Sequence, residues 1–132
     1  MKQHISLIRA KIEEKYYTKL KVSGFNLESD EPVAIGGTNK APSPIDLMNS
    51  ALASCTVMYL LSKAEIENIN TGAIKIKIVV TKNESRSFRF ERTLSFENNL
   101  SENEIQKLLL FADKTPVTRA LKEGNEILTS IK

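Results

Sequence analysis

The stretch "SPIDLMNSALASCTVMYLL" (residues 43–61) predicts a long helix, and it contains the single cysteine of the chain, Cys55. Ser43 is a favourable N-cap residue, and Pro44 suits the first helical position because an N–H there would have no partner inside the helix. Asp46 lies three residues after the cap, where an acidic side chain can complete a capping box. These residues together predict where the helix starts.

The predicted helix is apolar on nearly all of its sides. Neither Gly nor Pro follows Pro44 before about Asn68, so the helix can run that far. At helical spacing, one face carries Leu47, Ala51, Cys55, Met58 and Ser62. The opposite face carries Met48, Leu52, Tyr59 and Leu60. A helix that is apolar all round is buried all round, and the small residues at positions 50, 51, 53 and 54 would let a second helix approach closely. We therefore expect a partner subunit against this helix.

Two segments in which polar and apolar residues alternate predict two antiparallel β units. The first covers residues 8–25, which we interpret as a β-hairpin, and a structured loop with the pair Gly36-Gly37 follows it. The second pairs residues 73–80 with residues 88–96 across a turn, with one face in a core. Arg92 interrupts the apolar side of the last strand, and we interpret it as an edge residue.

The C-terminal third predicts two helices and a strand. Ser101 and the glutamate three residues later form a capping box that opens a helix through residue 111. Thr115 N-caps a short helix over residues 116–123, which ends at a glycine. The segment "EILTSIK" (residues 126–132) is predicted to be a last strand. This order of elements predicts a single α+β domain over residues 1–132.

Length and composition limit the functional classes. The 132 residues suffice for one domain with a core, and the formal net charge of +3 is small. Lysines are spread along the chain without interleaved aromatic residues, so we expect no nucleic-acid partner. Residues 1–12 lack a signal-peptide pattern, and the apolar segment 47–61 is interrupted and short for a membrane span, so we expect a cytoplasmic protein. One cysteine and one histidine, His4, argue against a disulfide framework and a metal site, and no cofactor is predicted.

Taken by itself, Cys55 is better explained as packing than as a nucleophile. Free cysteine is among the most buried residue types and packs as a small hydrophobe. A reactive cysteine needs a nearby cation or a helix N-terminus that favours its thiolate. Cys55 lies about three turns into the predicted helix, where the helix dipole contributes little. A cation would have to come from elsewhere in the fold.

The order of these motifs resembles the OsmC/Ohr family, the osmotically inducible and organic hydroperoxide resistance proteins. The central helix of that family opens with a proline, an acidic residue and a leucine, and it reaches a cysteine about three turns later. The matching residues here are Pro44, Asp46, Leu47 and Cys55. The second motif of the family, a Cys-Pro-Val-like step before a short helix, corresponds to Thr115-Pro116-Val117. The resemblance extends from residue 30 to about residue 121.

The resemblance implies a fold and a chemistry. The fold is an α+β intertwined homodimer, with antiparallel sheets from both chains around long buried central helices. The chemistry is thiol-dependent reduction of hydroperoxides, in which a thiolate attacks the O–O bond and becomes a sulfenic acid. A second cysteine then condenses with it to a disulfide, and an external dithiol restores both thiols. Cys55 matches the attacking cysteine and would lie at the dimer interface.

Three positions depart from the family pattern. Thr115 stands where the family has its resolving cysteine, so an external thiol would have to resolve the sulfenic acid. Ile45 stands where well-studied peroxidase members carry a glutamate. Asp46 is adjacent but about 100° further round the helix, and it is a candidate catalytic residue as well as a capping residue. The activating arginine of the family precedes the helix, and Arg9 is the only arginine upstream of Cys55.

Three functional hypotheses follow. In the first, the protein is a thiol-based redox protein that reduces organic or lipid-like hydroperoxides through Cys55, with an external thiol reductant. In the second, it has lost the peroxidase cycle and binds a small apolar ligand in a pocket at the dimer interface. In the third, Cys55 carries a small thiol as a mixed disulfide. Arg119 and Lys40 are further candidates for the cation that any reactive Cys55 needs.

Overall fold

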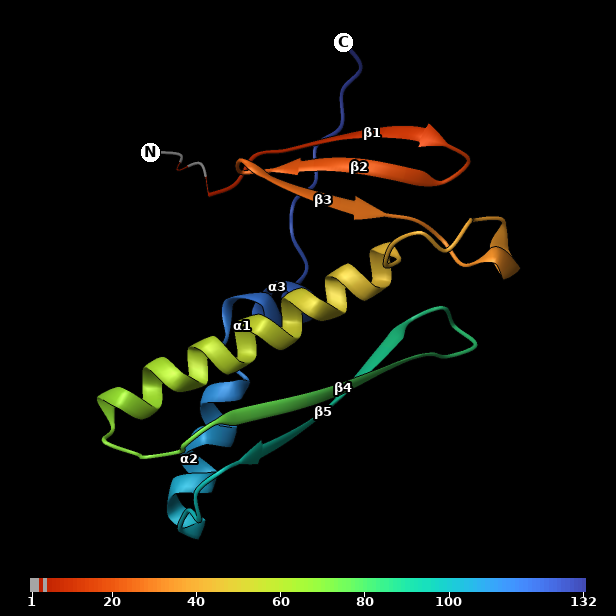
Figure 1. The fold of residues 1–132 in the computed structure, drawn as a ribbon. Helices are drawn as coiled ribbons and strands as arrows, with labels where there is room; N and C mark the ends of the chain where they lie inside the picture. Colours follow the sequence, from red (N-terminus) through yellow and green to blue (C-terminus); the bar gives the residue numbers. More distant parts are fainter. Residues whose placement is uncertain (1–2, 4) are drawn as a thin grey trace. The chain divides into compact units, whose positions relative to one another are not determined.

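The computed structural model describes residue 3 and residues 5–132, so the sequence argument from His4 lies outside the described residues. The chain divides into two compact units, Met1–Met48 and Asn49–Lys132. Figure 1 shows the elements in chain order, coloured from red at the N-terminus to blue at the C-terminus. Each unit is built around its own antiparallel sheet.

The first unit contains a three-stranded antiparallel sheet in the order β1-β2-β3. Its strands are β1 (Ile8–Glu14), β2 (Tyr17–Val22) and β3 (Phe25–Ser29). The predicted hairpin is confirmed by β1 and β2, whereas β3 was not predicted. The tight connection between β2 and β3 explains the difference: Ser23 and Gly24 both have positive φ, 46° and 93°, as in the two-residue turns that suit hairpins.

The loop after β3 is tightly folded, as predicted. It contains a short 3₁₀ turn, η1 (Val33–Ile35), which Gly36 ends at a φ of 100°. Gly37 comes so close to Glu31 that a Cβ atom built on it would lie 1.8 Å from the carbonyl oxygen of Glu31. A larger residue at position 37 would therefore force the backbone apart.

The long helix α1 (Pro44–Ile66) begins at the predicted position. Ser43 Oγ accepts from the backbone N–H of Asp46, and Asp46 Oδ2 accepts from the backbone N–H of Ser43, both at 3.1 Å. This reciprocal pair is the expected capping box. The helix ends two residues before the predicted limit.

Within the single chain, one face of α1 is buried, and the burial of its other sides, expected against a partner subunit, stays a prediction. The buried residues recur every four positions and are Leu52, Thr56, Leu60 and Ala64. Met58 and Leu61, on other sides of the helix, are 68% and 49% exposed. With 23 residues and a mean hydropathy of 1.2, α1 could cross a membrane by length and composition alone, a property that core helices of soluble proteins share.

The second unit packs α1 with a hairpin and two shorter helices. These elements are β4 (Ile74–Lys82), β5 (Phe88–Phe96), α2 (Glu102–Ala112) and α3 (Pro116–Glu123). Strands β4 and β5 are antiparallel, with Ile78 opposite Arg92. The core cluster consists of Leu60, Ala64, Ile69, Leu108 and Ala112. Partly buried residues from β4, β5 and α2 pack against this core.

The local signals at the two C-terminal helices are confirmed, but the predicted last strand is not. Ser101 and Glu104 form the expected capping box of α2, and Gly124 follows the last residue of α3 with a φ of 77°. Residues 125–132, in contrast, form no regular secondary structure. A strand needs a neighbour for its backbone hydrogen bonds, and no ladder among the described residues includes this segment.

Candidate functional site

Cys55 lies at an open groove in the second unit. Its side chain is partly exposed, and the groove has a volume of about 480 Å³. The other lining residues come from α1 and from the start of α3 and are Ala51, Ser54, Met58, Tyr59, Pro116 and Val117. A small apolar molecule could therefore reach the sulfur without any rearrangement of the core.

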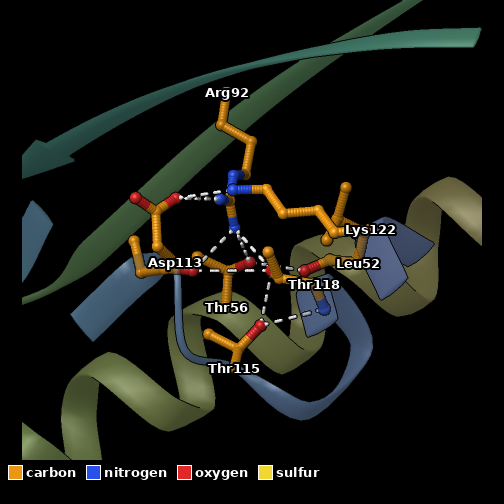
Figure 2. Close-up of polar contacts among 8 residues, drawn as sticks. Leu52, Thr56, Arg92, Asp113, Thr115, Thr118 and Lys122 are labelled. Carbon is orange, nitrogen blue, oxygen red and sulfur yellow. Dashed lines mark hydrogen bonds and ion pairs between the residues drawn. The ribbon is translucent and has the colours of Figure 1, made fainter. Parts of the chain in front are cut away.

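A largely buried arginine organises the polar contacts on the neighbouring face of α1 (Figure 2). Arg92 Nη1, from β5, donates to Thr56 Oγ1 at 3.1 Å, to the carbonyl oxygen of Ala112 at 3.2 Å and to Thr118 Oγ1 at 2.9 Å. Its Nη2 lies 3.6 Å from Asp113 Oδ1, and only 16% of its side chain is exposed. We call Arg92, Thr56, Thr118 and Ala112 the arginine cluster.

Arg92 lies on an edge strand, since β5 belongs to a two-stranded sheet, but its side chain is not the surface group that the interpretation as an edge residue suggests. Its side chain crosses to α1, to the last residue of α2 and to α3, which lie 20 to 36 positions away in the sequence. An arginine can be buried in this way when hydrogen bonds satisfy its donors. Here the two N–H groups of Nη1 are shared among the three oxygens named above. The sequence signal that could have indicated this inward role is the interruption that Arg92 makes in the apolar pattern of β5.

Thr115 continues this polar network. Its Oγ1 accepts from the backbone N–H of Thr118 at 3.2 Å and donates to Thr118 Oγ1 at 2.6 Å, and the residue is fully buried. Thr115 is thus the N-cap of α3, as its position before Pro116 predicted. Pro116 and Val117, the two residues after Thr115, line the groove with Cys55, whereas Thr115 itself is buried and does not line it.

The remaining candidate residues have other partners. Arg119 Nε pairs with Glu123 at 3.3 Å on the surface of α3, and Asp46 belongs to the capping box of α1. In the first unit, Lys40 Nζ lies 5.3 Å from the centre of the Tyr17 ring. Arg9 is exposed on β1 opposite Lys21, on the side of the strand that does not carry Ile8 and Ala10. None of these contacts assigns a catalytic role.

The loop in the first unit holds one buried carboxylate. Asp30 accepts from the hydroxyl of Thr38 and from the backbone N–H groups of Glu31, Thr38 and Lys40. The Thr38 hydroxyl contributes most, and together these donors lower the pKa of Asp30 to about 2 against the opposing effect of burial. This carboxylate stabilises the loop rather than an exchangeable ligand, because its donors come from the loop itself.

No group of three or more metal-ligating side chains occurs within residues 3 and 5–132. The chemistry that the second unit offers is therefore that of a single thiol in an apolar groove, next to a buried polar cluster that contains no second thiol. This arrangement, on an α+β frame with a long helix, defines a single-cysteine α+β protein.

Comparison with protein families identifies the group to which this protein belongs. The model of the OsmC-like protein family matches residues 37–130, more than half of the chain. The chain therefore belongs to the OsmC-like protein family, as its motifs predicted. No curated protein sequence matches it significantly.

Solved structures agree on the fold. A Psychrobacter arcticus 273-4 protein assigned to the osmotic stress induced and detoxification response has a TM-score of 0.78 and 20% identity over 89% of each chain. The OsmC like protein of Mycoplasma pneumoniae gives 0.73 and 19% over 92% of this chain and 89% of that chain. The organic hydroperoxide resistance protein OhrB of Bacillus subtilis gives 0.62 and 20%, over 90% and 91%. At these identities the similarity establishes the OsmC-like fold, with antiparallel sheets and a long central helix, and nothing finer.

Proposed function

We propose that this protein is a one-cysteine redox protein that reduces organic hydroperoxides through Cys55 and is regenerated by an external thiol. The observation that carries the proposal is the position of Cys55. The chain belongs to the OsmC-like protein family, and an organic hydroperoxide resistance protein is among the solved structures similar to it. The single thiol of this chain is partly exposed in an apolar groove. An apolar groove favours the organic part of such a substrate.

The proposed reaction balances with one thiol and two equivalents of a reductant. The Cys55 thiolate attacks the O–O bond of ROOH, forms Cys–SOH and releases RO⁻, which takes a proton and leaves as ROH. An external thiol R′SH then displaces water and gives the mixed disulfide Cys–S–S–R′. A second R′SH restores the Cys55 thiol and leaves as R′SSR′, so two electrons pass from the external thiols to the peroxide.

We further propose that the protein acts as an intertwined homodimer. Support comes from apolar side chains that the chain leaves exposed on α1 and in the C-terminal segment. The most exposed of these are Met58, Ile66, Ile127, Leu128 and Ile131. Large apolar side chains exposed in this number are typical of surfaces that pack against a partner subunit. A partner would also offer residues 125–132 a neighbouring strand, which no ladder among residues 3 and 5–132 gives them.

A direct test uses hydroperoxide and a sulfenic-acid probe. Stoichiometric cumene hydroperoxide should convert Cys55 of the native protein to a species that dimedone traps, with dimedone added to the peptide that contains Cys55. With dithiothreitol present, the protein should consume hydroperoxide catalytically. Cys55→Ser should abolish both effects.

A matched control moves the thiol by one residue. The double variant Cys55→Ser/Ser54→Cys keeps one thiol at the same groove but places it about 100° away round α1. If the position of Cys55 is responsible, this variant should react with hydroperoxide far more slowly than the wild type. Equal rates would show that any thiol at the groove suffices, and a native Cys55 that resists both iodoacetamide and hydroperoxide would exclude the redox function.

The alternative is a family member that binds an apolar ligand or carries a small thiol without peroxidase turnover. One observation favours it: the resolving position is Thr115, which is buried and hydrogen-bonded to Thr118. A carrier would form a stable mixed disulfide with a small disulfide reagent but would not consume hydroperoxide. The same dimedone and turnover measurements therefore separate the two functions.

A further inference from the structure

Four basic side chains form a cluster on one face of the ladder between β1 and β2. They are Arg9, Lys11, Lys19 and Lys21, and we call this surface the basic face. The strand register places Arg9 directly opposite Lys21 and Lys11 directly opposite Lys19. Because side chains alternate along a strand, all four point to the same side of the sheet, opposite to Ile8 and Ala10.

Like charges in directly opposed positions of a sheet destabilise it. The β4–β5 sheet of the same chain avoids this arrangement: Lys75 lies opposite Ser95, Lys77 opposite Thr93, and Arg89 opposite Thr81. The basic face instead has two such pairs side by side. One sheet of this chain thus has no directly opposed cations, whereas the other has two such pairs side by side. A bound anion would explain this difference, because it would offset the repulsion between the opposed cations.

The cluster surrounds a hollow of about 440 Å³. The opposed pair Ala10 and Leu20 lies between the two cationic pairs with its side chains on the other face, so its backbone lines the hollow, and Asn26 completes the lining. Opposed residues have Cβ atoms about 5 Å apart. Alternate residues on one strand lie about 7 Å apart. The four basic side chains thus start from an area about the size of a short phosphate chain.

These cations are largely without carboxylate partners. Lys21 Nζ donates to Asn26 Oδ1 at 3.0 Å, and in residues 3 and 5–132 neither Lys11 nor Lys19 forms an ion pair within 4.0 Å. Glu28 on β3 is the carboxylate opposite Lys19. It forms no ion pair with Lys19 within 4.0 Å, and its hydrogen-bonding interaction with the Tyr17 side chain raises the pKa of that phenol.

We propose that the basic face binds a compact polyphosphate anion, such as inorganic tripolyphosphate or the triphosphate group of a nucleotide. Binding would neutralise the two opposed cationic pairs together, because several negative charges enter one hollow. The proposal concerns the first unit of the chain and does not depend on the reactivity of Cys55.

Larger anionic partners fit the basic face less well. Single-stranded nucleic acid requires exposed aromatic rings on which bases stack, and on this side of the sheet the ring of Tyr17 already has Lys40 over it. A lipid surface would need apolar side chains beside the cations, but Ile8 and Ile12 point to the other face of the sheet. The small area of the cluster therefore favours a short phosphate chain.

Isothermal titration with inorganic tripolyphosphate tests the proposal on the full chain. We expect saturable binding at 20 mM salt that weakens at 150 mM, and at least tenfold weaker binding of orthophosphate. The variant Lys11→Gln/Lys19→Gln should lose at least tenfold in affinity. The matched control Lys75→Gln/Lys77→Gln removes the same charge from exposed positions of β4 and should stay within twofold of the wild type.

A melting experiment gives an independent readout. Without anion, Lys11→Gln/Lys19→Gln should melt at a higher temperature than the wild type, because one repulsive pair is gone. Tripolyphosphate should raise the melting temperature of the wild type more than that of this variant. Adenosine triphosphate then distinguishes the sources: equal affinity would mean recognition of the phosphate chain alone, and tighter binding would add a contribution from the nucleoside.

Three outcomes would overturn the proposal. The first is no binding of tripolyphosphate at low salt. The second is an equal loss of affinity in both double variants, which would reduce the effect to net charge. The third is tighter binding of a single-stranded oligonucleotide or an anionic lipid vesicle than of tripolyphosphate, which would assign the basic face to a larger partner.

Discussion

Arg92 Nη1 lies 3.1 Å from Oγ1 of Thr56, the residue that follows Cys55 on α1. The same nitrogen also reaches Thr118 at the start of α3, so one guanidinium ties β5 to both walls of the Cys55 groove. Thr56 Oγ1 in turn donates to the carbonyl oxygen of Leu52 at 2.6 Å, which satisfies its own proton. The arginine cluster thus holds together the two helices that line the Cys55 groove.

Arg92→Met should be strongly destabilising. The variant keeps much of the side-chain volume but removes the donor to Thr56, Ala112 and Thr118, whose oxygens stay buried. Loss of charged hydrogen bonds from a largely buried site predicts a decrease of about 2–4 kcal/mol in the free energy of unfolding, measured by urea denaturation.

The matched control is Arg89→Met on the same strand. Arg89 pairs with Glu91, but 74% of its side chain is exposed, so the change should stay below about 0.5 kcal/mol. Equal losses in the two variants would show that the arginine cluster contributes nothing beyond an ordinary surface arginine.

Thr115→Ala should remove the cap of α3. The variant loses the acceptor for the backbone N–H of Thr118 and the donor to the Thr118 hydroxyl, which predicts a loss of about 1 kcal/mol or slightly more. Thr115→Ser keeps the hydroxyl and should recover most of that stability. Urea denaturation of the three proteins checks the order, and an unstable Ser variant would point to packing of the methyl group instead.

Much of the fold could be predicted because its signals are local. The start of α1 at Ser43, the capping box at Ser101 and the cap at Thr115 each depend on residues within three positions of one another. Short-range hydrogen bonds of this kind are specified by the sequence of one turn. The family assignment also rests on such local motifs in the correct order.

The remaining features depend on contacts that distant segments make. Arg92 finds its partners on three helices, and a pattern along β5 could show only that its side of the strand was interrupted. The basic face likewise requires the register that puts Lys11 opposite Lys19, whereas in the sequence the lysines look evenly spread. The segment 126–132 has a strand-like sequence, but an isolated extended segment gains no ladder hydrogen bonds.

Asp30 should give the protein an acid-sensitive loop. Its pKa in the folded protein is about 2, below the ordinary value of 3.8, because the Thr38 hydroxyl and three backbone N–H groups favour the ionised form. A carboxyl whose pKa is depressed by folding contributes stability that is fully present above its unfolded pKa and is lost as the pH falls towards about 2. Asp30→Asn should therefore lower the urea midpoint at pH 7, and the difference from the wild type should shrink as the pH falls from 4 to 2.

The control for this experiment is Glu84→Gln in the exposed turn between β4 and β5. It makes the same change in net charge but should leave the urea midpoint at pH 7 unchanged. A difference between Asp30→Asn and the wild type that stays constant down to pH 2 would contradict the depressed pKa.

The proposed dimer should depend on the exposed side of α1 that carries Met58. Sedimentation equilibrium of the wild type at micromolar concentration should give twice the mass of the chain. Met58→Lys places a charge on a side chain that is 68% exposed in the single chain, so it should be tolerated in a monomer but costly at an interface. Val79→Lys is the control, since Val79 shares the solvent-facing side of β4 with Lys77. A folded wild-type monomer, or dissociation of both variants alike, would contradict the proposed interface.

Thr115→Cys tests whether the family geometry persists around Cys55. Thr115 stands at the resolving position of the family and directly precedes Pro116 and Val117, which line the groove with Cys55. If the family geometry holds, a thiol at position 115 should come within bonding reach of the sulfenic acid. One equivalent of hydroperoxide should then consume both thiols and produce an intramolecular disulfide, whereas the wild type should yield only the dimedone-trappable species. Mass spectrometry of the non-reduced tryptic digest distinguishes the two products. Thr118→Cys, which places a thiol at another buried position of the same network, is the matched control and should form no bridge. If neither variant forms a disulfide while Cys55 still reacts with hydroperoxide, α3 holds position 115 too far from the sulfur, and Cys55 is resolved only by thiols from solution.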